Sequence, residues 1–110
     1  MLRSFSYAAY AGLHAFTSGR PDAARVEPWA CAWQTWVASA FLRAYLQTAQ
    51  GATFLPSSPA AAERLLDALA IDKALYELEY ELNNRPEWVR IPLWGILPLI
   101  RTKEMDSTRA

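Results

Sequence analysis

Apolar residues recur at intervals of three and four along most of this 110-residue chain, and this spacing constrains the fold more than any other feature. Positions three and four apart lie on one side of an α-helix, whereas a half-buried strand alternates apolar and polar positions. The sequence has no such alternation, no internal repeat and no low-complexity tract. A chain of this length ordinarily forms one domain around one hydrophobic core. We therefore predict an all-α fold, a small helical bundle with a single core.

The apolar pattern divides into four helical segments. Natural helices usually open on a capping Ser, Thr, Asp or Asn, but the first pattern is already running at Leu2 without a cap. We therefore expect this end to be cut from a longer helical protein. Gly51 supplies a stop signal after the second segment. The predicted helices cover residues 1–17, 28–50, 58–84 and 92–101, and residues 102–110 form a polar, frayed tail.

The third segment has the clearest boundaries. Ser58 offers a capping hydroxyl, and the proline that follows it suits the first helical turn. Beyond residue 70 the helix either continues or restarts with Asp72 as its cap. It ends before Pro86, because the residue that precedes a proline disfavours helical backbone geometry.

The sequence has 11 Lys and Arg residues and 11 Asp and Glu residues, so its formal charges balance. Without a basic excess, neither nucleic acid nor a membrane is an expected partner. The single cysteine, Cys31, is expected to be a small buried thiol, which fits a reducing, cytoplasmic setting. The longest near-apolar run, residues 91–100, is about half the length of a membrane-spanning helix. The N-terminus lacks the features of a signal peptide.

Residues with catalytic or metal-binding chemistry are sparse. The four glycines are far apart, so no loop that cradles phosphates is predicted. His14 and Cys31 are the only residues of their kind, which predicts no metal site, and His14 is expected to be structural. Glu77 and Glu81 share a helix side, but no cleft that would make them a glycosidase-type pair is predicted. We therefore expect no catalytic residues, metal ligands or cofactor contacts in this chain.

Three of the five tryptophans, Trp29, Trp33 and Trp36, share one face of the second predicted helix. Large rings favour burial, so core packing is the simplest interpretation and a ligand platform is the alternative. A small domain has few walls that can bury five such rings. Part of this aromatic surface is therefore a candidate for contact with a partner or another lobe.

The segment from residue 73 to 84 does not have the composition of plain core. On a helical wheel, Leu75, Leu78 and Leu82 fall on one side, which we predict to face the core. The opposite side combines phenols with an ammonium and an amide, which is unusual for a solvated face. Its members are Lys73, Tyr76, Tyr80 and Asn84, with Glu77 beside them.

A sugar is the ligand class that suits this side, because sugar rings lie against aromatic rings while polar side chains bind the hydroxyl groups. Two plainer interpretations remain open. Lys73 and Glu77, four residues apart, have the spacing of a surface ion pair. Tyr76 and Tyr80 have the same spacing and can simply pack together under a neighbouring lobe.

The stretch KALYELEYELNNRPEWVRIPLWGI, residues 73–96, resembles the C-terminal end of maltokinases, including those fused to trehalose synthase. The opening MLRSFSYAA, residues 1–9, is similar to the helix that follows the metal-binding acidic motif in that family, and WQTWVASAFLRAYL is also similar. The resemblance extends to about Arg101. The order of residues in the 73–96 block is specific, since helix-forming pressure alone would seldom produce it.

The resemblance implies that residues 1–101 are the C-terminal helical subdomain of a protein-kinase-like C-lobe, related to aminoglycoside phosphotransferases. It also implies an enzyme of α-glucan metabolism that uses ATP and Mg²⁺ to convert maltose to maltose 1-phosphate. The family positions that hold maltose match Lys73, Tyr76 and Tyr80, and weaker candidates match Glu77, Asn84 and Trp88.

This sequence departs from the family pattern by omission. It lacks the nucleotide-binding lysine of the N-terminal lobe, the catalytic aspartate and the acidic residues that hold Mg²⁺, on which phosphoryl transfer depends. We therefore expect no kinase activity from this chain alone, and expect the remainder of the kinase, with trehalose synthase in fusions, as its partners. A free-standing helical interaction module is the main alternative. A membrane-surface helix over residues 91–101 is a further one.

Overall fold

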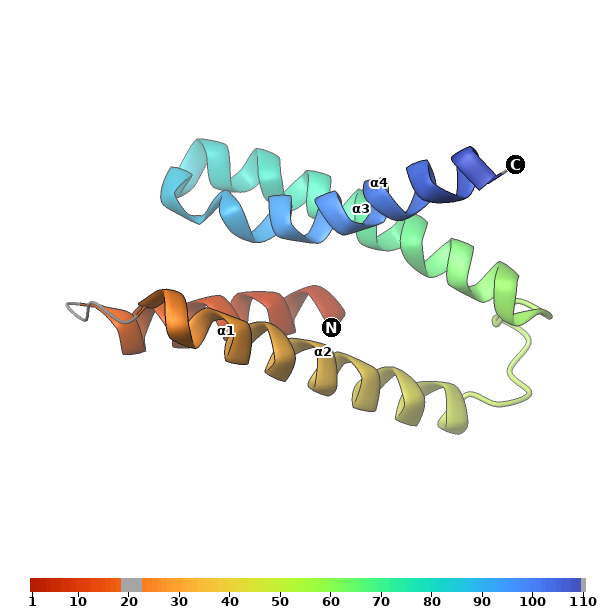
Figure 1. Ribbon diagram of the computed structural model, residues 1–110. Helices are drawn as coiled ribbons and strands as arrows, with labels where there is room; N and C mark the ends of the chain where they lie inside the picture. The colour runs from red at the N-terminus through yellow and green to blue at the C-terminus, as the bar shows by residue number, and fades with distance from the viewer. Residues whose placement is uncertain (19–22, 110) are drawn as a thin grey trace. The chain divides into compact units, whose positions relative to one another are not determined.

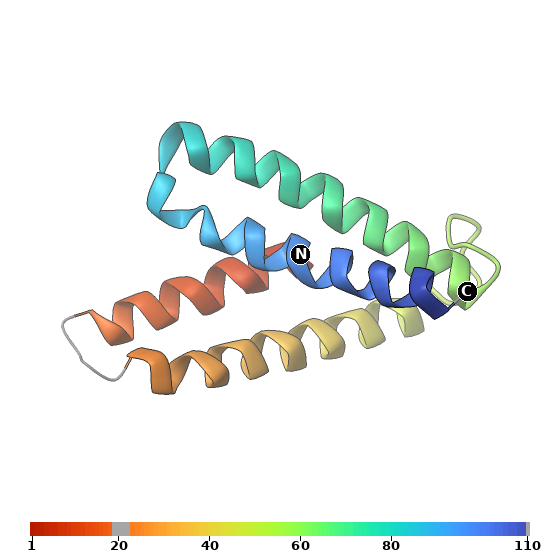
Figure 2. The same ribbon diagram turned by 45° about the horizontal axis from the view of Figure 1, so that its top comes forward.

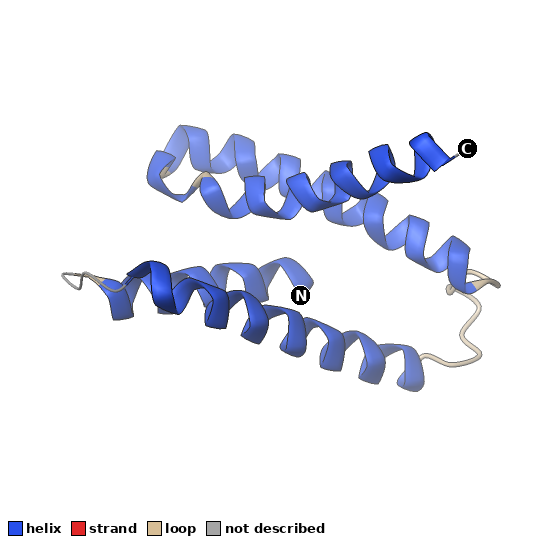
Figure 3. Cartoon of the chain, in the orientation of Figure 1, coloured by secondary structure: helices blue, strands red, loops and turns tan. Residues whose placement is uncertain are grey.

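The structure, a computed structural model, describes the backbone of residues 1–18 and 23–109 and the side chains of residues 1–18 and 24–101. Those residues form helices and connecting turns without a strand (Figure 3). The all-α prediction is confirmed. The elements in chain order are α1 (Leu2–Thr17), α2 (Ala23–Thr48), α3 (Pro59–Asn84), a 3₁₀ helix (Pro86–Trp88) and α4 (Arg90–Arg109) (Figure 1).

Two compact units make up the chain, Met1–Leu55 and Pro56–Ala110. The first is the hairpin of α1 and α2, and the second contains α3, the 3₁₀ helix and α4. Within each unit the two long helices lie side by side (Figures 1 and 2). In each unit the long helices pack on each other, α1 on α2 and α3 on α4, and a single core for the whole chain stays a prediction.

In the first unit, α1 and α2 meet through aromatic and polar contacts. The Phe5 and Phe41 rings pack edge to face with their centroids 5.7 Å apart. The Ser6 hydroxyl accepts a hydrogen bond of 2.8 Å from the Gln34 amide. Ser6 is the one buried residue among those described in this unit, whose apolar side chains are half-buried or exposed. The described part of this hairpin therefore has no fully buried apolar core.

The tryptophan row of α2 lies at the edge of the contact between the two helices and is largely exposed. Trp29 and Trp36 are 76% and 80% exposed, and Trp33 is 47% exposed. The prediction that these rings form core is wrong, because a hairpin covers one side of each helix and the row lies beside that side.

Two isolated polar residues of the first unit were also expected to be structural. Cys31 is exposed, so the prediction of a buried thiol is wrong. His14 is exposed near the end of α1, and its ring stacks on the Tyr10 ring with centroids 6.4 Å apart. No three Cys, His, Asp or Glu side chains in the described parts of the chain lie close enough together to hold a metal ion.

Helix boundaries agree with the sequence where the local signals are strong. The Ser58 hydroxyl caps α3 by accepting a hydrogen bond of 3.2 Å from the Ala61 backbone amide. Gly51 has a φ of +82°, a left-handed conformation that glycine adopts without strain. α3 runs without a break through Asp72, so it continues and does not restart there.

The starts and ends of α2 and α4 differ from prediction. α2 begins at Ala23, so Pro28 lies inside the helix instead of in its first turn. Residues 19–22, between the first two predicted helices, lie outside the described residues. α4 also contains a proline, Pro98, and continues to Arg109, where a frayed tail was expected. A proline removes one backbone donor, and both helices continue across that loss.

The second unit has buried side chains from both of its long helices. Ala74 and Ile91 are almost completely covered, at 1% and 2% exposed. Buried glutamates also belong to this interior, which makes it partly polar. The described residues that are buried in this unit are Ala74, Glu77 and Glu81 of α3 and Ile91, Pro92 and Ile96 of α4.

None of the described helices is long and apolar enough to cross a membrane.

The side of α3 that is covered is not the leucine side. Leu75 and Leu82 are 52% and 57% exposed, and Leu78 is half-buried, so the prediction that these leucines face the core is wrong. The backbone at Arg85 leaves the helical region, with φ −145° and ψ 71°, and the proline after it begins the turn into α4. This turn returns the chain along the side of α3 that carries Ala74, where a small side chain permits close helix packing.

Candidate functional site

The candidate site is a row of exposed side chains on the second half of α3, Lys73, Tyr76 and Tyr80, which we call the tyrosine row. The intervals of three and four residues place them on one side of the helix, across about 10 Å of its axis. Tyr76 is 61% exposed and Tyr80 is 47% exposed, and Lys73 is exposed as well. All three side chains are therefore accessible from the same side of α3.

Lys73 and Tyr76 form the first contact within this row. The Lys73 ammonium lies over the Tyr76 ring, with Nζ 4.6 Å from the ring centroid. A cation at this distance is attracted by the negative face of the ring, which holds the flexible lysine near the phenol. The pair places a cationic hydrogen-bond donor beside an aromatic surface.

Arg85 forms the second contact, at the other end of the row. Its guanidinium lies 5.7 Å from the Tyr80 ring centroid and 4.6 Å from that of Trp88. The same group donates two hydrogen bonds, of 2.9 and 2.8 Å, to the two carboxylate oxygens of Glu81. Glu81 is 1% exposed, so the anchor of Arg85 is buried while the rings beside it reach solvent. Because two of its nitrogens are bound to the carboxylate, the planar guanidinium is fixed in orientation and supports the Tyr80 and Trp88 rings beside it.

Sequence reasoning missed Arg85 as a member of the site. The signal was present, because Glu81 and Arg85 are four residues apart, the spacing at which helical side chains pair. What the spacing did not reveal was the burial of Glu81, which depends on the approach of α4. Trp88, a weaker candidate on the 3₁₀ helix, is half-buried and joins the row through Arg85.

Glu77 and Asn84 are the two other weaker candidates, and neither adds an uncommitted polar group to the tyrosine row. Glu77 is 8% exposed and belongs to the interior of the second unit, so it lies away from the exposed side of α3. The ion pair suggested for Lys73 and Glu77 stays a prediction, in which Glu77 would supply a buried carboxylate and not a surface one. The Asn84 side-chain amide donates a hydrogen bond of 2.8 Å to the Tyr80 backbone carbonyl on its own helix.

The exposed groups of the tyrosine row are of kinds that bind polar ligands. Aromatic rings, an ammonium and phenolic hydroxyls line the exposed side of α3. Glu77 and Glu81 are buried, whereas Asp72 and Glu79 on the other flank of the row are exposed. Glu81 is already engaged by Arg85, so its carboxylate is committed to an ion pair. Contact with a polar ligand that has flat apolar faces is what this chemistry favours.

Comparison with known proteins adds no family to this description. No family model matches the chain, and no solved structure matches it. The resemblance to maltokinases therefore depends on the residues quoted for it, of which the 73–96 block covers both the tyrosine row and Arg85.

Proposed function

We propose that this chain is the acceptor-sugar-binding part of a maltokinase-like enzyme, a helical piece of its C-lobe. In this proposal Lys73, Tyr76 and Tyr80 hold maltose or a related α-glucoside. The observation that supports it best is the exposed tyrosine row, with Lys73 over the Tyr76 ring. The sequence resemblance points to the same three positions by an independent route.

Each member of the row has a distinct role in this proposal. The apolar faces of the glucosyl rings lie against the phenol rings of Tyr76 and Tyr80, which provide area and a hydrogen-bonding hydroxyl. The Lys73 ammonium, with three donors, binds sugar hydroxyl groups next to the first ring. Arg85 keeps Tyr80 in place through its buried ion pair with Glu81.

The contribution to phosphoryl transfer is positioning. Phosphoryl transfer is catalysed mainly by alignment of the reactants and by stabilisation of charge on the transferred group. This part of the enzyme would fix the acceptor hydroxyl, while the ATP and Mg²⁺ sites belong to the remainder of the kinase. The chain alone is accordingly proposed to bind sugar without turning over ATP, in a cytoplasmic setting.

Calorimetric titration of the chain with maltose tests this proposal. Tyr76→Ala and Tyr80→Ala should each weaken maltose binding about tenfold, which corresponds to about 1.4 kcal/mol. Tyr45→Ala is a matched control, because Tyr45 is 46% exposed on α2 and is not a member of the tyrosine row. An equal loss in the control, or equal binding of the β-linked disaccharide cellobiose, would contradict an α-glucoside site on α3.

A free-standing helical interaction module is the second candidate function. The exposed tryptophans of α2 favour it, because exposed aromatic area is typical of protein contact surfaces. The reading frame upstream of Met1 discriminates between the two proposals. Catalytic and metal-binding aspartates encoded in frame would support the kinase, and a ribosome-binding site directly before Met1 would support the module.

A further inference from the structure

The first unit exposes an aromatic surface that the sugar-binding proposal does not use. We call it the tryptophan face and define it as Trp29, Trp33 and Trp36 of α2 with Phe16 and Gly12 of α1. Phe16 is 52% exposed, and two of the three tryptophans are more than three-quarters exposed. From these fractions and the area of aromatic side chains, the four rings expose about 500 Å².

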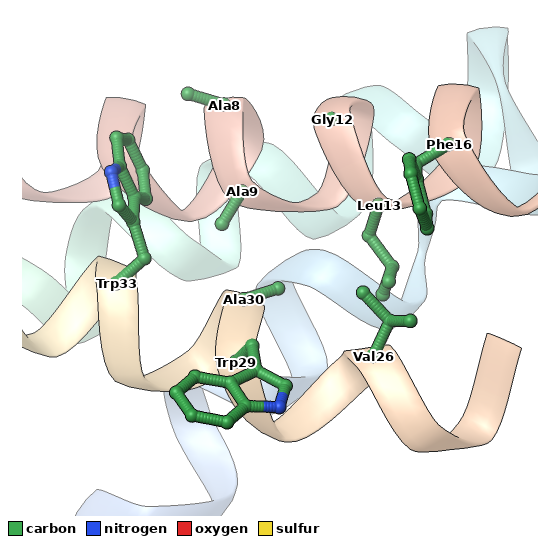
Figure 4. A pocket seen from close by; sticks show the side chains of 9 residues that line it. All are labelled: Ala8, Ala9, Gly12, Leu13, Phe16, Val26, Trp29, Ala30 and Trp33. Carbon is green, nitrogen blue, oxygen red and sulfur yellow. The ribbon is translucent and has the colours of Figure 1, made fainter.

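A groove runs between α1 and α2 within this face (Figure 4). It has a volume of about 410 Å³. Small residues of α1 and Ala30 of α2 leave room between the larger side chains, and a Cβ added at Gly12 would have no neighbour within 4 Å. The residues that line the groove are Ala8, Ala9, Gly12, Leu13, Phe16, Val26, Trp29, Ala30 and Trp33.

Most of the groove is formed by uncharged stretches of the two helices, and the charged residues Arg25 and Glu27 stand at the end that carries Val26. No Asp, Glu, Lys or Arg occurs from Pro28 to Leu42 or from Ser4 to Ser18. Exposed helix faces ordinarily carry charged side chains, and a charged partner would lose solvation here without gaining an ion pair. A complementary surface is therefore mainly apolar, and the tryptophan face is itself a surface of that kind.

The same face also supplies both shapes that a self-complementary contact needs. Trp36, at 80% exposed, lies beyond the residues that line the groove and can project from α2, while the groove is a recess on the same hairpin. In a twofold pair, the same patch serves both copies, so each projection can meet the recess of the other. The four rings alone provide more than half of the ~800 Å² that each partner buries in a standard interface.

We propose that two copies of this chain associate through the tryptophan face, with the α1–α2 hairpin of one copy packed on that of the other. Two such hairpins form a four-helix arrangement, in which apolar rings that one hairpin leaves exposed become covered. The contact gives the first unit the buried apolar core that it lacks alone. It uses neither Lys73 nor Tyr80, so it is independent of sugar binding.

Sedimentation equilibrium of the full chain, over a hundredfold range of concentration, tests this association. The wild-type chain should approach twice its 12.4 kDa mass. Trp36→Glu should weaken the dimer at least tenfold by placing a charge in the covered area. Gly12→Arg should do the same by filling the groove, and it should not disturb the hairpin, because arginine is a better helix former than glycine and the space is open.

Leu82→Glu is the control, since Leu82 is 57% exposed but lies in the second unit. It should leave association unchanged, and far-ultraviolet circular dichroism should show the same helix content in all variants. A monomeric wild-type chain would overturn the proposal. So would a dimer that survives both Trp36→Glu and Gly12→Arg, or one that is lost equally in Leu82→Glu.

Discussion

The two hairpins of this protein are built from similar helices but differ in what they bury. The α3–α4 unit covers Ala74, Ile91 and Ile96 together with two glutamates, whereas Ser6 is the one buried residue described in the α1–α2 unit. The first unit is not poorer in apolar residues, since it holds three of the five tryptophans. The difference lies in where those residues stand relative to the partner helix. Apolar content alone therefore does not determine which hairpin has a core.

Polar burial differs between the units in the same way. In the second unit, Glu81 is covered completely and is paired with Arg85 at both carboxylate oxygens. In the first unit, the buried polar group is a neutral hydroxyl, which Gln34 satisfies from the facing helix. A buried carboxylate requires a fixed partner, and that requirement makes the end of α3 and the following turn specific.

The largest expected effect is a difference in the free energy of unfolding between core truncations in the two units. Ile91→Ala should lower the free energy of unfolding by about 3 kcal/mol, because Ile91 is 2% exposed and its loss leaves a cavity. Leu42→Ala, at a half-buried position of α2, should cost only about 1 kcal/mol. Urea unfolding followed by circular dichroism measures both. Equal losses would remove the contrast between a hairpin with a core and one without.

A second substitution tests the buried carboxylate. Arg85→Ala should destabilise the chain by about 2 kcal/mol, because it removes the guanidinium that pairs with both carboxylate oxygens of buried Glu81. The figure is below that of fully buried pairs, since the Arg85 side chain is 43% exposed. Arg43→Ala, at an exposed position of α2, should change stability by less than about 0.5 kcal/mol. Comparable behaviour of the two arginines would show that the Glu81 pair contributes no more than a surface charge.

The smallest expected effect lies in the first unit and is stabilising. Gly12→Ala should raise the free energy of unfolding by about 0.5–1 kcal/mol, because alanine loses less backbone entropy in a helix and its Cβ meets open space. Thermal unfolding monitored by circular dichroism would show the gain as a higher Tm. A loss of stability would mean that something occupies the space beside Gly12 in solution.

The parts of the fold that follow from local sequence were predictable. The Ser58 cap depends on a single hydroxyl and the next turn of helix, and the end of α3 depends on the proline that follows Arg85. Such signals act over a few residues, so they do not need knowledge of the partner helix.

The covered faces were not predictable in the same way. The leucines of α3 were expected inside because of their chemistry, yet Leu75 and Leu82 are exposed and Ala74 is covered. The choice of side depends on the direction in which α4 returns, which the turn at Arg85 sets. The tyrosine row is exposed because it does not share the side of α3 that carries Ala74. Its exposure therefore does not depend on burial of the leucines.

The unequal exposure of the tryptophans gives the molecule an internal optical reporter. Trp29 and Trp36 are solvated, whereas Trp88 is half-buried under the Arg85 guanidinium. Indole emission moves to shorter wavelengths when water is removed from the ring, so covering the α2 rings would shift the spectrum without any label. Intrinsic tryptophan fluorescence can thus report the covering of the α2 rings in the first hairpin and the burial of Trp88 in the second.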